Sequence, residues 1–275
     1  MSSVTRTAPM LSDGKMFPVT IFVLIANAVA SKVLAAFAEH GPVAALVGGL
    51  GLSWAFWLSF ALCIRLALIE EDRAPRPRDL WVCGACLLAA LIPISQVSAL
   101  ACTALALVLL LDRTRGVALK AAAWILLAIS VQLLWSRLTM LLFVGPIAAL
   151  DAHLVSLLTQ TPVQGNTVQF ADGARGGMSI LGACTSVQNA SVALMLFVAI
   201  VRTFRPAPVR SEIYLLIGLF LSVVVINVVR LALMAQSMAM FRLVHGDVGG
   251  GVTNGIITAD ALLWAVISVR REIFD

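Results

Sequence analysis

The chain has 275 residues, of which 61% are hydrophobic and 12% charged, and its mean hydropathy is +1.01. Soluble domains carry about 25% charged and under half apolar residues, so a soluble globular domain is excluded and much of the surface must face lipid. The net charge of +5 comes from short basic clusters between apolar runs, and only one Tyr is present. This pattern fits orientation in a membrane and argues against nucleic-acid binding.

The apolar runs predict an all-α fold, a polytopic transmembrane helical bundle of about eight helices. A spanning helix needs about 20 mostly apolar residues. The first run is too long for the apolar part of a cleavable signal peptide, so we expect it to be retained. The third and fourth runs are short and predict a hairpin interrupted at Pro93. The helices are expected near 17–37, 43–68, 80–93, 96–111, 118–136, 181–201, 212–240 and 252–269.

Two further segments lie between the fifth and sixth predicted helices. The stretch 138–150 contains Pro146 and is too short to span, so it is expected to be re-entrant or interfacial. Residues 151–180 are polar and Gly-rich, and they predict a long outward-facing loop. Loops of this length often carry function.

The basic residues predict that both termini are cytoplasmic. With the N-terminus inside, 14 of the 19 Lys and Arg residues fall on cytoplasmic segments and helix ends, as the positive-inside rule requires. The other five are Lys32, Arg137, Arg175, Arg230 and Arg242. The 14 are Arg6, Lys15, Arg65, Arg73, Arg76, Arg78, Arg113, Arg115, Lys120, Arg202, Arg205, Arg210, Arg270 and Arg271.

Four of the five cysteines are interpreted as small buried apolar residues. They are Cys63, Cys83, Cys86 and Cys102. Three scattered histidines give no metal-ligand spacing, and the chain has no phosphate-binding or dinucleotide-binding motif. We therefore expect neither a metal nor a cofactor.

Arg230 interrupts an apolar run, SVVVINVVRLALMAQSM. A charge in a membrane helix is costly and usually faces a polar interior. Arg230 lies 18 residues after Glu212, roughly 27 Å along the helix, and therefore near the outer edge of the bilayer core. Asn227 lies one turn below it on the same face and suggests a polar lining. The alternative is a snorkelling arginine without a role.

Cys184 opens the sixth predicted helix, in MSILGACTSVQNASVALML. That helix runs from outside to inside, so Cys184 lies at the outer face. The positive end of the helix dipole favours the thiolate there. Gln188 follows at i+4 and shares its face. The alternative interpretation is an ordinary helix–helix interface rich in small and polar residues.

His245 lies in the outer loop before the last helix, and its neighbour Asp247 could orient the ring. The predicted topology places Cys184, Arg230 and His245 in the outer leaflet. A nucleophile, an acid/base and a fixed cation at one depth are the groups that acyl transfer requires. Asp151, His153 and Asp260 are further polar residues with weaker claims to a role.

These segments together resemble the exosortases and archaeosortases. GACTSVQNASVALML is similar to their signature Cys helix, NVVRLALMA to their Arg motif, and VHGDVGGG to their His element. Upstream, PIAALDAHLVSLL and VQGNTVQF resemble the stretch that precedes the Cys helix. The resemblance covers roughly 120–270. It departs from common members at Thr185-Ser186, Gln188 and Gly246, which leaves the subfamily open.

The resemblance implies a membrane cysteine protease or transpeptidase with Cys184, Arg230 and His245 as catalytic residues and Gln188 and Asn227 positioning the substrate. Its partners would be exported proteins anchored by a C-terminal sorting tail, and an acceptor of lipid or glycan class. Residues 1–16 would form a cytoplasmic tail, 17–117 variable transmembrane helices and 118–275 the catalytic core. The enzyme would sit in the cytoplasmic membrane with its site facing outward. The alternatives are a solute transporter, a non-catalytic subunit of envelope polysaccharide assembly and an acyltransferase that loads lipid onto Cys184.

Overall fold

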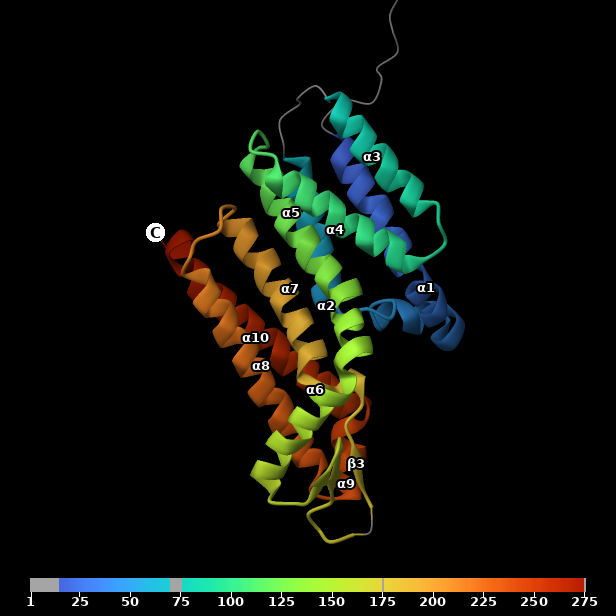
Figure 1. The fold of residues 1–275 in the computed structure, drawn as a ribbon, viewed down its shortest axis with the longest axis vertical. Helices are drawn as coiled ribbons and strands as arrows, with labels where there is room; N and C mark the ends of the chain where they lie inside the picture. The colour runs from blue at the N-terminus through green and yellow to red at the C-terminus, as the bar shows by residue number, and fades with distance from the viewer. Residues whose placement is uncertain (1–14, 70–75, 175, 275) are drawn as a thin grey trace, which may run out of the picture.

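A computed structural model describes residues 15–69, 76–174 and 176–274. The chain folds almost entirely into helices (Figure 1). Arg6, Arg73 and Arg175, which entered the charge count, lie outside the described residues. The helices are α1 (Met16–Val47), α2 (Trp54–Leu68), α3 (Pro77–Ala90), α4 (Ser95–Leu111), α5 (Val117–Ser130), α6 (Ser136–Thr159), α7 (Ser186–Phe204), α8 (Glu212–Met234), α9 (Met238–His245) and α10 (Asp247–Phe274).

The prediction of an all-α membrane bundle is confirmed at this level. Five helical stretches are long and apolar enough to cross a membrane: Met16–Val47, Val117–Thr159, Ser186–Phe204, Glu212–Met234 and Val248–Glu272. α2 and α4 are shorter apolar helices packed among them. α3 and α4 form the expected hairpin, with Pro93 in the turn between them.

The predicted helix 43–68 is wrong, because a glycine-rich break divides it. α1 kinks at Gly41, which has φ +75°, and then continues to Val47. Gly49 and Gly51 both adopt positive φ in the following turn, a conformation that glycine takes without steric cost. α2 begins after Ser53, whose hydroxyl accepts the backbone N–H of Phe56 as a helix cap. The apolar composition of this segment concealed its turn.

The predicted helix 118–136 and the separate segment 138–150 belong to one helical stretch. α5 passes through a π-helical turn at Val131–Trp135 into α6, and the helix runs from Val117 to Thr159. It kinks at Phe143, where φ is −127°. Its 43 residues would measure about 65 Å if straight, against a hydrocarbon core of about 30 Å. The segment 138–150 is therefore part of one long kinked helical stretch and not a separate element.

The predicted loop 151–180 is largely structured. Its first part is the end of α6, and a small antiparallel sheet follows with the order β1-β2-β3. The strands are β1 (Val163–Gln164), β2 (Thr167–Gln169) and β3 (Gly177–Ser179). The backbone N–H groups of Ala171 and Asp172 donate to the carbonyls of Ala235 and Gln236, so the sheet is tied to the turn after α8.

The predicted helix 212–240 is also two helices. α8 ends at Met234, and the separate helix α9 is capped by Ser237, whose hydroxyl accepts the Met240 N–H. α10 is longer than the predicted 252–269 and begins directly after Gly246. α9, the sheet and the end of α6 lie together at one end of the molecule, which we call the far end (Figure 1).

α7 is the central helix, because α2, α5, α8 and α10 all pack against it. One continuous core includes residues from α1, α2, α4, α5, α7, α8 and α10. A second core at the far end joins α6, the sheet and the end of α8.

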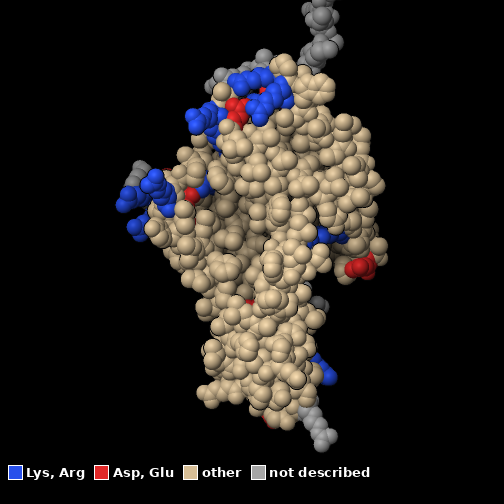
Figure 2. All heavy atoms as spheres, viewed as in Figure 1, with Lys and Arg blue, Asp and Glu red and all other residues tan. Residues whose placement is uncertain are grey.

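Basic residues gather at the end opposite the far end, which we call the basic end (Figure 2). There Arg202 and Glu212 form a buried ion pair that connects the end of α7 to the start of α8. Arg205 binds Glu272 at 2.6 Å and so fixes α10 to the same point. The segments that join α4 to α5 and α7 to α8 lie at this end, and they carry Arg113, Arg115 and Arg210.

Candidate functional site

Cys184 lies on a short 3₁₀ turn, Gly182–Cys184, immediately before α7. The prediction that α7 begins near residue 181 and contains Cys184 is therefore wrong, because the helix starts at Ser186. The thiol is free and half-buried, whereas the other four cysteines are fully buried as expected. The Cys184 side chain packs against the far-end core.

Asp151 of α6 holds this turn in place. Its carboxylate accepts the backbone N–H and the hydroxyl of Ser186, each at 2.9 Å. The carboxylate therefore caps the first turn of α7, where backbone N–H groups have no partner within the helix. Asp151 had only a weak claim to a role in the sequence analysis, since a capping partner 35 residues upstream leaves no local pattern. The one signal was an acid inside an apolar run that matched the resemblance.

Asn227 of α8 connects the Cys184 turn to the helix that carries Arg230. Its side chain is fully buried and donates to the Cys184 carbonyl at 2.9 Å and to the Ser186 hydroxyl at 3.2 Å. Its amide oxygen accepts the side-chain N–H of Asn189 at 2.8 Å. The predicted polar lining below Arg230 therefore exists, and it contacts the backbone of the cysteine turn.

Arg230 lies one turn further along α8 and is half-buried. Its Nε is buried and has no hydrogen-bond partner among the described residues. It lines a cavity of about 470 Å³ between α8, α9 and α10, whose other lining residues are almost all apolar. Leu243 and Val244, the two residues that precede His245, line the same cavity.

His245 is the last residue of α9 rather than part of a loop. Its exposed ring stacks on Phe241, with centroids 5.1 Å apart and planes inclined by 19°. Phe241 and Val244 pack against the same far-end core as Cys184. The side chain of Asp247, suggested as the group that orients the ring, lies outside the described residues.

The structure brings some of the predicted site residues into contact and leaves others apart. Cys184 and Asn227 are in direct contact, and Arg230 shares a cavity with the helix that ends at His245. Among the described residues, no hydrogen bond or ion pair joins the side chains of Cys184, Arg230 and His245. The Gln188 side chain is half-buried without a hydrogen bond to another described residue, and its carbonyl accepts the Ser191 hydroxyl.

The arrangement supplies an accessible thiol on a fixed turn and, on the adjoining helix, a cation with an unused donor. These groups are suited to covalent chemistry on a carbonyl carbon. No group of three His, Cys, Asp or Glu residues in the described part of the chain could hold a metal ion. Comparisons with protein families, with curated proteins and with solved structures find no match to the chain.

Proposed function

We propose that the protein is a membrane cysteine protease or transpeptidase that removes the C-terminal sorting tail of exported proteins. The tail would comprise a short motif, an apolar helix and a basic cluster. The observation that carries the proposal is the hydrogen bond from Asn227 to the Cys184 carbonyl. It holds the candidate nucleophile beside the helix that carries Arg230, in agreement with the resemblance of the Cys, Arg and His segments to the exosortases and archaeosortases.

In the proposed mechanism the Cys184 thiolate attacks the carbonyl carbon of the scissile peptide bond. A thioester forms between Cys184 and the substrate as the C–N bond breaks, and His245 donates a proton to the departing amine. His245 then takes a proton from water or from a lipid or glycan acceptor, whose oxygen attacks the thioester. The thiolate is released, and the new C-terminus is either free or joined to the acceptor.

Arg230 stabilises the negative charge that develops on the carbonyl oxygen. A preorganised donor acts more strongly where water is scarce, and the buried Nε of Arg230 has no described partner to compete for it. The exposed ring of His245 stacks on Phe241, and in this mechanism the substrate binds between α9 and the Cys184 turn. Gln188 and Asn227 are assigned to positioning the substrate and the cysteine turn.

The proposed topology is that of a protein of the cytoplasmic membrane with about eight spans and with both termini inside. α7 ends, α8 begins and α10 ends at the basic end, as the positive-inside rule requires of cytoplasmic ends. In this orientation Cys184 and α9 face the periplasm or the cell exterior, where exported substrates arrive.

The experiment compares cells that carry the wild type with cells that carry Cys184→Ala. Mass spectrometry follows the C-termini of exported proteins that end in an apolar helix and a basic cluster. We expect the tails to persist only in the variant cells. Equal processing in both strains would rule out Cys184 as the nucleophile and with it the protease.

A solute transporter is the second candidate, and Asp260 is the observation that favours it. This carboxylate of α10 accepts the hydroxyl of Ser222 on α8 at 2.6 Å, among apolar helices, and ionisable groups in that setting often line solute pathways. If tails are processed normally without Cys184, Asp260→Asn becomes the variant to assay in uptake measurements.

A further inference from the structure

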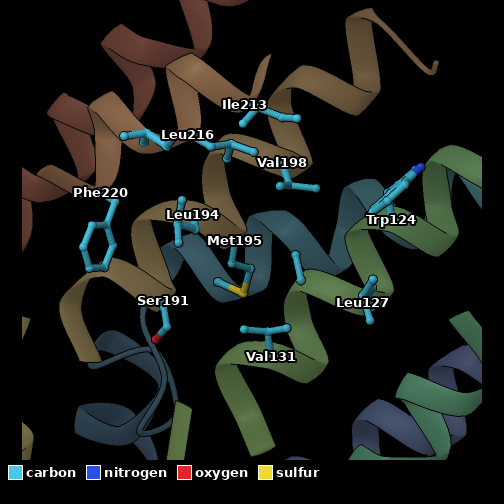
Figure 3. Close-up of a pocket in the computed structure, with 12 residues that line it drawn as sticks. Trp124, Leu127, Val131, Ser191, Leu194, Met195, Val198, Ile213, Leu216 and Phe220 are labelled. Carbon is cyan, nitrogen blue, oxygen red and sulfur yellow. The ribbon is translucent and has the colours of Figure 1, made fainter. Parts of the chain in front are cut away.

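A second cavity lies on the side of α7 between α5 and α8. It measures about 440 Å³, and Figure 3 shows side chains from all three helices pointing into one shared space. α5 and α8 each pack against α7, and the strip of α7 between them forms the floor. The floor residues are Ser191, Leu194, Met195 and Val198.

The lining of this groove is apolar. Leu127 comes from α5 and Val131 from the π-helical turn that follows it, and Ile213, Ile217 and Phe220 come from α8. Ile213 is 59% exposed and Ile217 51% exposed, so this wall is open to the surrounding bilayer. The Ser191 hydroxyl proton is already used, because it is donated to the Gln188 carbonyl. The groove therefore suits an apolar occupant that enters from the lipid.

The groove runs along α7 toward the Cys184 turn. Val198, Leu194 and Ser191 follow one another at helical spacing on α7. The turn before α7 contacts the same two walls, because Asn227 of α8 donates to the Cys184 carbonyl and Thr185 donates to Met140 of α6, the continuation of α5. Ser191 lies five residues after Ser186, the first residue of α7, which is about 8 Å along the helix axis. An occupant that lay along α7 in this groove would therefore have its end near the Cys184 turn.

We propose that this groove binds the apolar helix of the sorting tail, so that the helix lies along α7 and its outer end brings the scissile bond to Cys184. The inference rests on the proposed function for its substrate. A helix fits the groove better than a loose acyl chain, because only a rigid segment fixes the distance between the bilayer and a peptide bond outside it. Membrane helices associate through such close side-chain packing.

Photo-crosslinking tests the groove directly. p-Benzoylphenylalanine is placed at Leu194, Val198 or Leu216 in a Cys184→Ala chain, in cells that produce exported proteins with C-terminal apolar helices. The matched control is Leu107 of α4, which is 45% exposed and far from the groove in sequence and lining. We expect peptide sequencing to find C-terminal apolar helices in the adducts from the three groove positions and none from Leu107. Adducts with lipid alone, or with another copy of this chain, would overturn the assignment.

Filling the groove gives a second readout in chains that retain Cys184. Leu194→Trp should reduce tail processing about tenfold, because the added ring occupies space the helix needs, whereas Leu107→Trp should leave it unchanged. Normal processing in Leu194→Trp would overturn the groove and leave Cys184 as the nucleophile. If helix adducts form but tail processing does not depend on Cys184, the groove assignment stands and the protease assignment fails.

Discussion

Cys184 owes its position to side chains that are remote in the sequence. Asp151 fixes the residue two places after it, and Asn227 holds its carbonyl. The sequence identified Cys184, Asn227 and Arg230 because polar residues in apolar runs are conspicuous. It could not identify Asp151 as a cap, since the cap forms only when a helix 35 residues upstream folds back.

Replacing Asp151 with Ala should destabilise the protein by about 1–3 kcal/mol, because the N–H and hydroxyl of Ser186 would lose their buried partner. Thermal unfolding of the purified protein in detergent measures the effect. Asp172→Ala is the matched control, since Asp172 is exposed and accepts the N–H of Ala174, two residues along the same loop. An unchanged melting temperature in Asp151→Ala would show that the cap is dispensable.

Arg230→Lys should lower tail processing by about 10²-fold or more, the usual effect of removing a donor that stabilises an oxyanion. Lys supplies a point charge and lacks the planar fork that contains Nε. Arg242→Lys, on the exposed surface of α9, serves as the control and should process normally. Near-normal processing by Arg230→Lys would contradict the role given to Arg230.

At the scale of elements, hydropathy located the long helices better than their ends. The segments near 43–68 and 212–240 are each divided by a turn, at 48–53 and around Gln236. Both turns lie within apolar sequence, so hydropathy does not reveal them. The small sheet was unpredictable because its strands have only two or three residues. Its stability comes from contacts with α6 and the end of α8.

α8 and α10 meet closely at Gly218. A Cβ atom there would lie 2.4 Å from the Trp264 ring, and the Trp264 N–H donates to Ser222, which limits how the ring can move. Gly218→Ala should therefore destabilise the protein by about 1–3 kcal/mol in thermal unfolding. Gly84→Ala in α3 meets open space and should be neutral or slightly stabilising. Trp264→Phe should restore part of the loss in the double variant; no loss in Gly218→Ala would show that the ring moves freely.

At the scale of the molecule, the apolar composition and the uneven distribution of basic residues were enough to predict a helical membrane bundle. The sequence suggested a division between the helices before and after residue 117. In the structure, helices from both sides of that position share one continuous core. Hydropathy does not predict which helices pack together, so this shared core was not predictable. The number of spans is a prediction from hydropathy, and their orientation is a prediction from the distribution of Lys and Arg.

Because four cysteines are buried, Cys184 provides a direct probe of orientation. A membrane-impermeant maleimide applied to intact spheroplasts should label the wild type and leave Cys184→Ala unlabelled. Arg113→Cys in the Cys184→Ala chain places a thiol at the basic end and should react only after the membrane is permeabilised. Labelling of Arg113→Cys in intact spheroplasts would reverse the proposed topology.

The π-helical turn at Val131–Trp135 sets the angle at which α6 leaves α5. An α-helix turns by about 100° per residue, and a π-helical turn contains an additional residue relative to the α-helical repeat. Deleting one residue there would rotate the rest of α6 about its axis by roughly that angle. Asp151 would then point away from Ser186 although no residue of the site had changed. The direction of the candidate nucleophile therefore depends on the register of a π-helical turn well upstream of Asp151.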